Sequence, residues 1–332
     1  MFILQSYTLA VVFCIITMLC WGSWANTQKL VQGNWRFELF YWDYIIGVVL
    51  FSVLLAFTLG STGEAGRPFI EDLRQAGLSN LGSAFLGGII FNISNILLVG
   101  SIAIAGMSVA FPVGVGLALV LGVVVNYMSS PLGNPGILFL GVGLIVAAMV
   151  INSLAYSSMK RKASAGTSGK GLITAILAGI FMGFFYKYVA DSMFADFENP
   201  LVGKLSPYTA VFIFTLGMLA SNFILNTLIM FKPFVGKPVG YKSYFAGNLK
   251  THLIGVLGGL IWCMGMSFSI IASGKAGPAI SYGLGQGATV VASIWGIFIW
   301  KEFAGGTKRT KIMLNVMLVL YVLGLALIVA SR

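Results

Sequence analysis

Long apolar runs alternate with short polar connections along the whole chain. Runs of about 20 residues, the length that an α-helix needs to cross a hydrocarbon core of about 30 Å, recur ten times. The connections are rich in glycine, proline, serine or charge, and none is long enough to hold a soluble domain. The pattern therefore predicts an all-α integral membrane protein. The expected transmembrane helices cover residues 7–28, 38–60, 80–104, 107–128, 135–157, 171–192, 207–230, 249–273, 277–300 and 311–330.

One part of this pattern repeats at a spacing of 171 residues. Residues 86–122 align with residues 257–293 without gaps, and nine of the 37 positions are identical. Phe91 then falls on Trp262, which keeps an aromatic ring at that place in each copy. The repeat unit holds five helices, and because five is odd, the two units must enter the membrane in opposite directions. Such a 5+5 inverted repeat is frequent in secondary transporters, whose substrate site lies near the midplane between the two units.

Three regions follow from the repeat. Residues 1–157 are expected to form the first five-helix repeat, and residues 171–332 the second. Residues 158–170 are expected to form a basic cytoplasmic loop between them. The first apolar run lacks a basic start, since no Lys or Arg precedes Lys29, so it is interpreted as a retained helix and not as a signal peptide.

Composition supports membrane burial and changes the interpretation of the charge. Hydrophobic residues make up 58% of the chain, charged residues 9%, and the mean hydropathy is +0.95, whereas soluble domains are about 45–50% apolar and about 25% charged. The net charge of +11 would suggest nucleic-acid binding in a soluble protein. Here the Lys and Arg residues lie between apolar segments, as the positive-inside rule expects, so no nucleic-acid partner is predicted and the lipid bilayer is the expected surrounding.

The basic residues also predict an orientation. Fourteen of the 20 Lys and Arg residues lie in connections that share one side of the membrane. This side is predicted to be cytoplasmic, which places both termini outside. The connections concerned cover residues 29–36, 158–170, 232–250 and 301–311.

Metal, redox and enzymatic chemistry find little support in the sequence. The three cysteines all lie inside apolar segments, and His252 is the only histidine. A disulfide framework, a metal site or a cofactor is therefore not expected. A membrane-embedded enzyme would need a nucleophile with a base, or metal ligands, and the few titratable residues argue against it.

Polar side chains inside apolar helices mark the candidate substrate site, because they are costly against lipid and usually face an interior cavity. In the helix at 277–300, Tyr282, Gln286 and Thr289 are spaced to share one face. Asn92 and Asn95 are three residues apart near the middle of the helix at 80–104. These groups are predicted to bind a neutral polar solute. Interhelical hydrogen bonding is the alternative, since such side chains also join helices in membranes.

Aromatic residues complete the candidate site. Trp262 is expected to stack against the solute, and Trp24 to line or gate the cavity together with Trp21 and Gln28, which share its helix face. Aromatic anchoring at the membrane interface is the alternative for Trp24. Pro112 predicts a kink or local opening in its helix, with close packing at the neighbouring glycines as the alternative.

Few charged residues are available to couple transport to an ion. Asp43 lies just inside its helix and is a candidate proton acceptor; the alternative is a structural ion pair with Lys29 or Arg36. His252 is either a proton relay or a histidine at the membrane edge.

Lys187 and Asp191 form a second candidate for ion coupling. They are four residues apart on one helix, and a salt bridge between them could break during transport. A lysine that extends to the interface beside a solvated aspartate is the alternative.

Short segments spread over nearly the whole chain carry a family resemblance through their order. They include Tyr41-Trp42-Asp43-Tyr44, Thr58-Leu59-Gly60, Gly87-Gly88-Ile89, Gly106-Met107-Ser108-Val109, Leu138-Phe139-Leu140-Gly141-Val142, Pro207-Tyr208-Thr209-Ala210 and Lys301-Glu302-Phe303. With this order the chain resembles the drug/metabolite transporter superfamily, and within it the ureide permease family and the related bacterial glucose, ribose and L-rhamnose sugar porters.

The resemblance implies a secondary transporter for uptake of a small neutral polar solute, coupled to protons. A monosaccharide and a ureide or nucleobase-like compound both remain open as substrates, and an exporter of metabolites or drugs is the alternative function. Plant ureide permeases carry a long central loop with a phosphate-loop-like motif. Here the loop is short, and Gly166-Thr167-Ser168-Gly169-Lys170 lacks the required spacing, so nucleotide binding is not implied.

Overall fold

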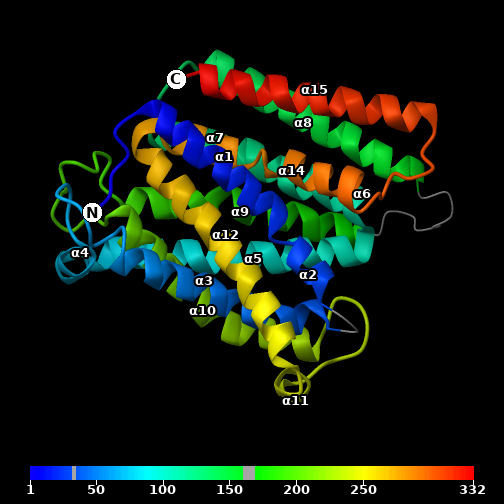
Figure 1. The fold of residues 1–332 in the computed structure, drawn as a ribbon, viewed down its shortest axis with the longest axis horizontal. Coiled ribbons are helices and arrows are strands. Elements are labelled where there is room, and N and C mark those ends of the chain that lie inside the picture. The colour runs from blue at the N-terminus through cyan, green and yellow to red at the C-terminus, as the bar shows by residue number, and fades with distance from the viewer. Residues whose placement is uncertain (32–34, 160–168) are drawn as a thin grey trace.

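The computed structural model describes residues 1–31, 35–159 and 169–332. Within these residues, ten helices are long and apolar enough to cross a membrane, which confirms the all-α membrane fold. They run roughly alongside one another in a single bundle (Figure 1). The spans are Tyr7–Leu30, Phe37–Phe57, Leu78–Ala105, Pro112–Ser129, Pro135–Met159, Gly169–Ser192, Pro207–Phe231, Leu249–Ala276, Pro278–Ile299 and Lys308–Ala330.

Several spans are divided, and short helices lie between others. The first half contains α1 (Tyr7–Ser23), α2 (Asn26–Leu30), α3 (Phe37–Phe57), α4 (Phe69–Gln75), α5 (Leu78–Ala105), α6 (Met107–Ala110), the π-helix η1 (Phe111–Val115), α7 (Gly116–Ser129) and α8 (Pro135–Met159). The second half contains α9 (Gly169–Ser192), α10 (Pro207–Phe231), α11 (Tyr241–Phe245), α12 (Leu249–Ala276), α13 (Pro278–Gly285), α14 (Ala288–Ile294), the π-helix η2 (Trp295–Ile299) and α15 (Lys308–Ala330).

The predicted spans agree with these bounds to within a few residues, and the departures have local causes. A π-helical turn contains Pro112, which lacks the N–H that a regular helix needs there. The span at 278–299 is interrupted around Gln286, where glycines on both sides weaken the helix. The predicted basic loop at 158–170 lies outside the described residues except at its two ends.

Helix bounds repeat at the same spacing as the sequence. Helices α5 and α12 each have 28 residues and begin and end 171 positions apart. Each ends at a glycine with positive φ, 81° at Gly106 and 85° at Gly277. A side chain is disfavoured at such a φ, so the shared glycine lets both helices turn directly into the next span.

The packing of the two halves is reciprocal. Helix α5 packs along α9 and α10, while α12 packs along α1 and α3. Both crossings are close enough to require glycine: a Cβ atom on Gly88 would lie 2.0 Å from the carbonyl oxygen of Phe214, and one on Gly259 would lie 1.9 Å from that of Tyr44. Each half therefore encloses the third helix of the other half.

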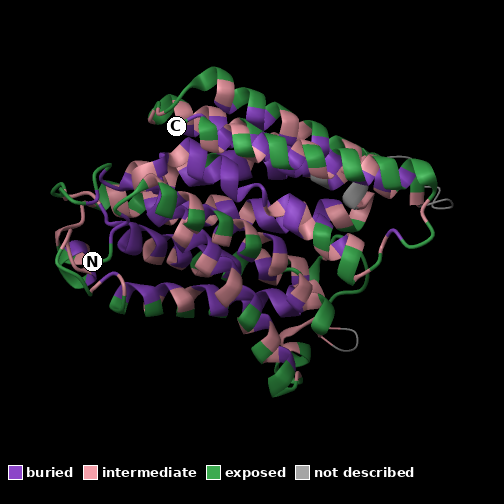
Figure 2. Cartoon of the chain, turned by 45° about the horizontal axis from the view of Figure 1, so that its top comes forward, coloured by how far each residue is buried: buried purple, intermediate pink, exposed green. Residues whose placement is uncertain are grey.

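Helices α8 and α15 pack against each other and form an outer layer (Figure 1). Side chains on their outward faces are exposed, among them Leu140 and Leu154 on α8 and Val319 and Val322 on α15. Figure 2 shows many exposed residues along the outer helices, with buried residues towards the middle of the bundle. Apolar exposure of this kind suits contact with lipid and not with water.

Candidate functional site

A cavity of about 560 Å³ lies where the two halves meet. It extends from the aromatic rings of Trp262 and Phe91, in the middle of α12 and α5, to Lys29 and Glu302 near the helix ends. Lys29 and Glu302 have side chains 46% and 28% exposed, so this end is its mouth. Segments α1, α2, α3, α5, η1, α8, α9, α12, α14 and η2 contribute to the wall.

The aromatic floor of the cavity is built from both halves. Trp262 lies 4.5 Å from Phe91 between ring centroids, and stacks on Trp21 at 6.1 Å and 13°. Phe91 and Trp262 occupy equivalent positions of the repeat. Their contact joins the third helix of the first half to that of the second half at the floor of the cavity.

Neutral polar groups line the wall above this floor. Asn95 donates to the hydroxyl of Tyr41 at 3.0 Å and also faces the cavity. Gln286 lines the cavity from the break between α13 and α14, and its side-chain amide has no hydrogen-bond partner among the described residues. Thr289, one turn further, lines the cavity as well. An unbonded amide beside aromatic faces can bind a solute through hydrogen bonds and ring stacking.

The structure brings together five of the seven residues proposed to bind substrate. These are Trp24, Asn95, Trp262, Gln286 and Thr289.

The other two of the seven lie behind the wall. Asn92 is fully buried, accepts from Tyr41 at 2.8 Å and donates to Ser221 at 2.9 Å. The hydroxyl of Tyr282 donates to backbone oxygens of Ala118 and Met182. The interhelical bonding considered for such residues is therefore found at Asn92 and Tyr282.

Charged and aromatic residues surround the mouth. Lys29 pairs with Glu302 at 2.8 Å and lies 4.7 Å from the centre of the Trp300 ring. Tyr156 donates to the second carboxylate oxygen of Glu302. Burial raises the pKa of Glu302, but the hydrogen bonds from Lys29 and Tyr156 outweigh it and hold the pKa below its ordinary value. Glu302 is therefore ionised at neutral pH and its charge is matched by Lys29.

The opposite end of the cavity is sealed by packed hydroxyl groups. The hydroxyl of Tyr186 lies 3.0 Å from that of Ser269 and 3.4 Å from that of Ser281. Cys14 is fully buried beside them, with its sulfur 3.7 Å from the Ser281 oxygen. These residues come from α9, α12, α13 and α1, so four helices converge on one small contact.

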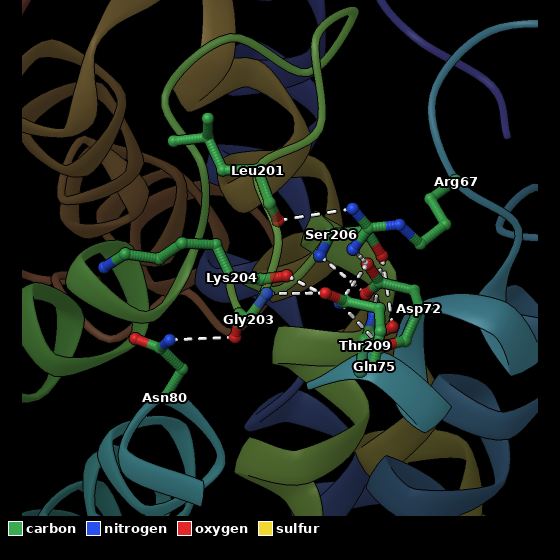
Figure 3. A network of polar contacts seen from close by, with 9 residues as sticks. All are labelled: Arg67, Asp72, Gln75, Asn80, Leu201, Gly203, Lys204, Ser206 and Thr209. Carbon is green, nitrogen blue, oxygen red and sulfur yellow. Dashed lines mark hydrogen bonds and ion pairs between the residues drawn. The ribbon is translucent and has the colours of Figure 1, made fainter. Parts of the chain in front are cut away.

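A buried polar network ties the surface segments at this sealed end (Figure 3). Asp72 on α4 accepts from Arg67 at 3.0 Å and from the backbone N–H of Ser206 at 2.7 Å. Ser206 caps α10, and Pro207 follows at the first helical position, where its missing N–H costs nothing. Gln75 adds bonds to the backbone of Gly203 and Lys204. The network joins the α3–α5 connection of one half to the α9–α10 connection of the other.

Asp43 lies outside the cavity and has partners that the sequence did not indicate. It bonds to His252 at 2.8 Å and to Tyr244 at 2.7 Å. The alternative pairing with Lys29 or Arg36 is wrong, because Lys29 pairs with Glu302 and Arg36 with Glu38. The true partners arrive from the second half and could not be matched by proximity in the sequence.

Lys187 and Asp191 form an ion pair along α9 at the sealed end of the molecule. Their side chains are 35% and 40% exposed. Neither residue lines the cavity. The two side chains are paired with each other, so the aspartate is not merely solvated beside an extended lysine. Their part in ion coupling stays a prediction.

Several residues of the cavity wall cannot be recognised from the sequence. Phe37, Phe185 and Met182 are apolar residues in apolar helices, so nothing in the pattern separates them from lipid-facing neighbours. The sequence gives a weak indication for Glu302, because an acidic residue next to Lys301 in a basic connection favours an ion pair. It gives none for its partner Tyr156. Only the folded chain shows that this pair borders a cavity.

Relatives of this chain are found among named transport proteins. Ureide permease 4 of Arabidopsis thaliana is 23% identical over 398 residues, covering 100% of this chain and 99% of the relative. Ureide permease 1 of the same plant is 22% identical over 387 residues, with the same shares covered. The glucose uptake protein GlcU of Bacillus subtilis (strain 168) is 28% identical over 240 residues, covering 70% of this chain and 69% of that protein.

A solved structure, described only as the crystal structure of a protein, has the same fold. Its TM-score is 0.59 at 15% sequence identity, over 95% of this chain and 96% of that one.

The family model for ureide permeases matches this chain over residues 40–170 and 162–331. The two matched segments meet at the central loop, where one half ends and the other begins. With ten apolar helices and relatives named as permeases, the chain is a multi-pass membrane transporter of small solutes and not an enzyme. It belongs to the ureide permease family.

Proposed function

We propose that this protein takes up a small neutral polar solute by proton-coupled alternating access. The observation that carries the proposal is the cavity between the halves. Its floor is aromatic, its wall presents the unbonded amide of Gln286 beside Asn95 and Thr289, and its charged groups Lys29 and Glu302 neutralise each other. A neutral ring with hydroxyl or amide groups fits this chemistry, whether monosaccharide, ureide or nucleobase-like. A charged solute would lack a partner at the floor.

The shape of the cavity supports an inward-open state. Its mouth lies at the end bearing the basic connections, which the positive-inside rule places in the cytoplasm. The opposite end is closed by Tyr186 and its hydroxyl partners. Residues 1–157 and 171–332 are proposed to act as the two inverted repeats, whose rocking would open the sealed end and close the mouth.

Uptake into proteoliposomes tests the function. Purified protein is reconstituted, a pH gradient is imposed, and accumulation of labelled D-glucose, D-ribose, L-rhamnose, allantoin and uracil is followed. We expect saturable accumulation of at least one of these solutes, which the uncoupler-treated vesicles lose. If none of them accumulates, the proposal fails. Efflux against a gradient in the opposite direction would favour the exporter instead.

A matched pair of variants ties the activity to the cavity. Gln286→Ala removes the unbonded amide from the wall, so the transport KM is expected to rise by about tenfold, the effect of losing roughly 1.5 kcal/mol of hydrogen bonding. Gln75→Ala is the control, because its amide lies in the network at the sealed end and not at the cavity. Equal KM values for Gln286→Ala and the unmodified protein would remove Gln286 from the site.

A further inference from the structure

A carboxylate and the single histidine of the chain meet where α12 and α11 pack on α3. The Asp43 side chain is 2% exposed and that of His252 is 23% exposed. One carboxylate oxygen, Oδ1, accepts both the Tyr244 hydroxyl and the imidazole Nδ1. The other oxygen, Oδ2, is buried without a hydrogen-bond partner. A buried, half-bonded carboxylate destabilises a fold, so its presence calls for an explanation beyond packing.

The other half of the molecule shows that packing does not require this cluster. The positions 171 residues away from Asp43, Tyr244 and His252 are Phe214, Leu73 and Leu81, all apolar. At these positions the crossing of α10 with α5 therefore carries apolar side chains, although its backbones approach as closely as those of α3 and α12. The cluster of Asp43, Tyr244 and His252 is therefore present only at the crossing of α3 with α12.

The geometry suits binding of one proton at the imidazole. An ionised carboxylate only accepts hydrogen bonds, so Nδ1 carries a hydrogen towards Asp43, and Nε2 remains to take the second proton. Nε2 has no hydrogen-bond partner among the described residues. The rings of Trp35 and Tyr244 stand edge-on to His252, with centroids 5.3 Å and 4.8 Å away. The Asp43 carboxylate stabilises a positive imidazolium.

No other charged side chain among the described residues pairs with Asp43 or His252. Arg36 and Glu38, on the neighbouring segment and on α3, pair with each other at 2.5 Å. Lys242 on α11 and Lys250 on α12 are exposed. Burial raises the pKa of Tyr244, and the hydrogen bond to the Asp43 carboxylate raises it further, so this hydroxyl keeps its proton.

The same turn of α3 reaches the cavity wall. The hydroxyl of Tyr41, two residues before Asp43, holds Asn95 at 3.0 Å. The ring of Tyr44, one residue after it, packs on Trp24 at 4.8 Å. A shift of this turn against α12 therefore moves two residues of the cavity wall together with the Asp43–His252 contact.

We infer that Asp43 and His252 form the proton-binding site through which a pH gradient drives the solute cycle. The inference rests on the proposed function and names its coupling site. Protonation at Nε2 balances the Asp43 charge and favours the closed crossing of α3 and α12. Release of the proton leaves the buried carboxylate without a countercharge, which favours movement of the crossing and of the Tyr41–Tyr44 turn.

Because His252 is the only histidine, one experiment tests the site without any transport. Untagged protein labelled with ¹⁵N-histidine is titrated from about pH 5 to about pH 8, the range in which histidine changes charge. We expect a single imidazole signal that responds to this change of pH and that differs between Asp43→Asn and the unmodified protein, because the carboxylate no longer faces Nδ1. Asp196→Asn, a fully exposed carboxylate elsewhere, leaves the signal and its response to pH unaltered. An imidazole signal that responds to pH identically in Asp43→Asn and in the unmodified protein overturns the inference.

A transport experiment separates coupling from solute movement. His252→Gln keeps a hydrogen-bond donor towards Asp43 but does not titrate. For one proton per neutral solute, each unit of pH gradient supports about tenfold accumulation. In His252→Gln and Asp43→Asn, accumulation of the solute that the unmodified protein concentrates falls to about onefold, while solute exchange at equal pH continues. Exchange also shows that the variants are folded.

The outcomes distinguish the two claims. If the unmodified protein concentrates none of the tested sugars, allantoin or uracil, the proposed function fails, whatever the titration shows. If it concentrates one of them and His252→Gln concentrates it equally well, the function stands and the coupling site is wrong.

Discussion

Two ion pairs stand at opposite ends of the molecule and differ in burial. Asp72 is completely buried and Arg67 is 14% exposed, and their pair is joined to the cap of α10. At the mouth, Lys29 and Glu302 are 46% and 28% exposed. The same chemistry therefore has two roles, because the energy of an ion pair depends on how much water surrounds it. At the sealed end, the buried ion pair joins two surface connections, whereas at the mouth the partly exposed pair only lines the opening.

The comparison also indicates which contacts can separate during transport. Breaking the Asp72 network would leave buried charge unpaired, so the segments it joins are expected to move as a unit. The contact of Tyr186 with Ser269 and Ser281 involves neutral hydroxyls, each bond contributing about 1 kcal/mol. The seal is therefore expected to open at the hydroxyls and not at the ion pair.

The largest effect is expected from Asp72→Ala. It leaves the Arg67 guanidinium and the Ser206 N–H without their acceptor, and should lower the free energy of unfolding by about 3–5 kcal/mol. Thermal unfolding in detergent measures the change. Asp196→Ala, on a fully exposed side chain, serves as the control and should change little. A loss no larger for Asp72→Ala than for Asp196→Ala would mean that the network does not hold the sealed end.

A smaller change in free energy is expected from Tyr186→Phe, which removes the hydroxyl that contacts Ser269 and Ser281 at the sealed end. Losing about 1 kcal/mol should raise the population of the outward-open state by about fivefold. Cys14 reports it, because its buried sulfur lies at the seal and becomes reactive when the seal opens. The measurement is its rate of alkylation by a maleimide in a background with Cys20→Ala and Cys263→Ala.

The mouth offers the control for this experiment. Tyr156→Phe removes a hydroxyl that bonds Glu302, at the end that is already open. It should not accelerate alkylation of Cys14. Equal acceleration by both substitutions would indicate general loosening and not opening of the sealed end.

The smallest effect is expected from Glu302→Gln, whose exposed pair with Lys29 should contribute about 0–1 kcal/mol. Because the pKa of Glu302 is lower in the folded state than its ordinary value of 4.5, its contribution is present above about pH 4.5 and is lost as the pH falls further. Unfolding temperatures of the variant and the unmodified protein should therefore differ at neutral pH and converge in acid. A difference that grows in acid would reverse the assigned sign.

Much of the site was predictable because membrane burial constrains polar residues strongly. Gln286, Thr289 and Asn95 face the cavity as expected, since an amide or hydroxyl in an apolar helix has few other places to go. Asn92 and Tyr282 also avoid lipid, but they do so by hydrogen bonding to neighbouring helices and not by facing the cavity. Periodicity does not distinguish the two outcomes, because both put the side chain inside the bundle.

The sequence by itself determined the ten spans and the pairing of Phe91 with Trp262 at equivalent positions of the repeat. These follow from hydropathy, segment length and repeat spacing, which are properties of the linear chain. Only the tertiary structure decided that Asp43 meets His252 and that Lys29 meets Glu302. Such partners lie more than 200 residues apart, and the helix crossings that join them are set by packing between the two halves.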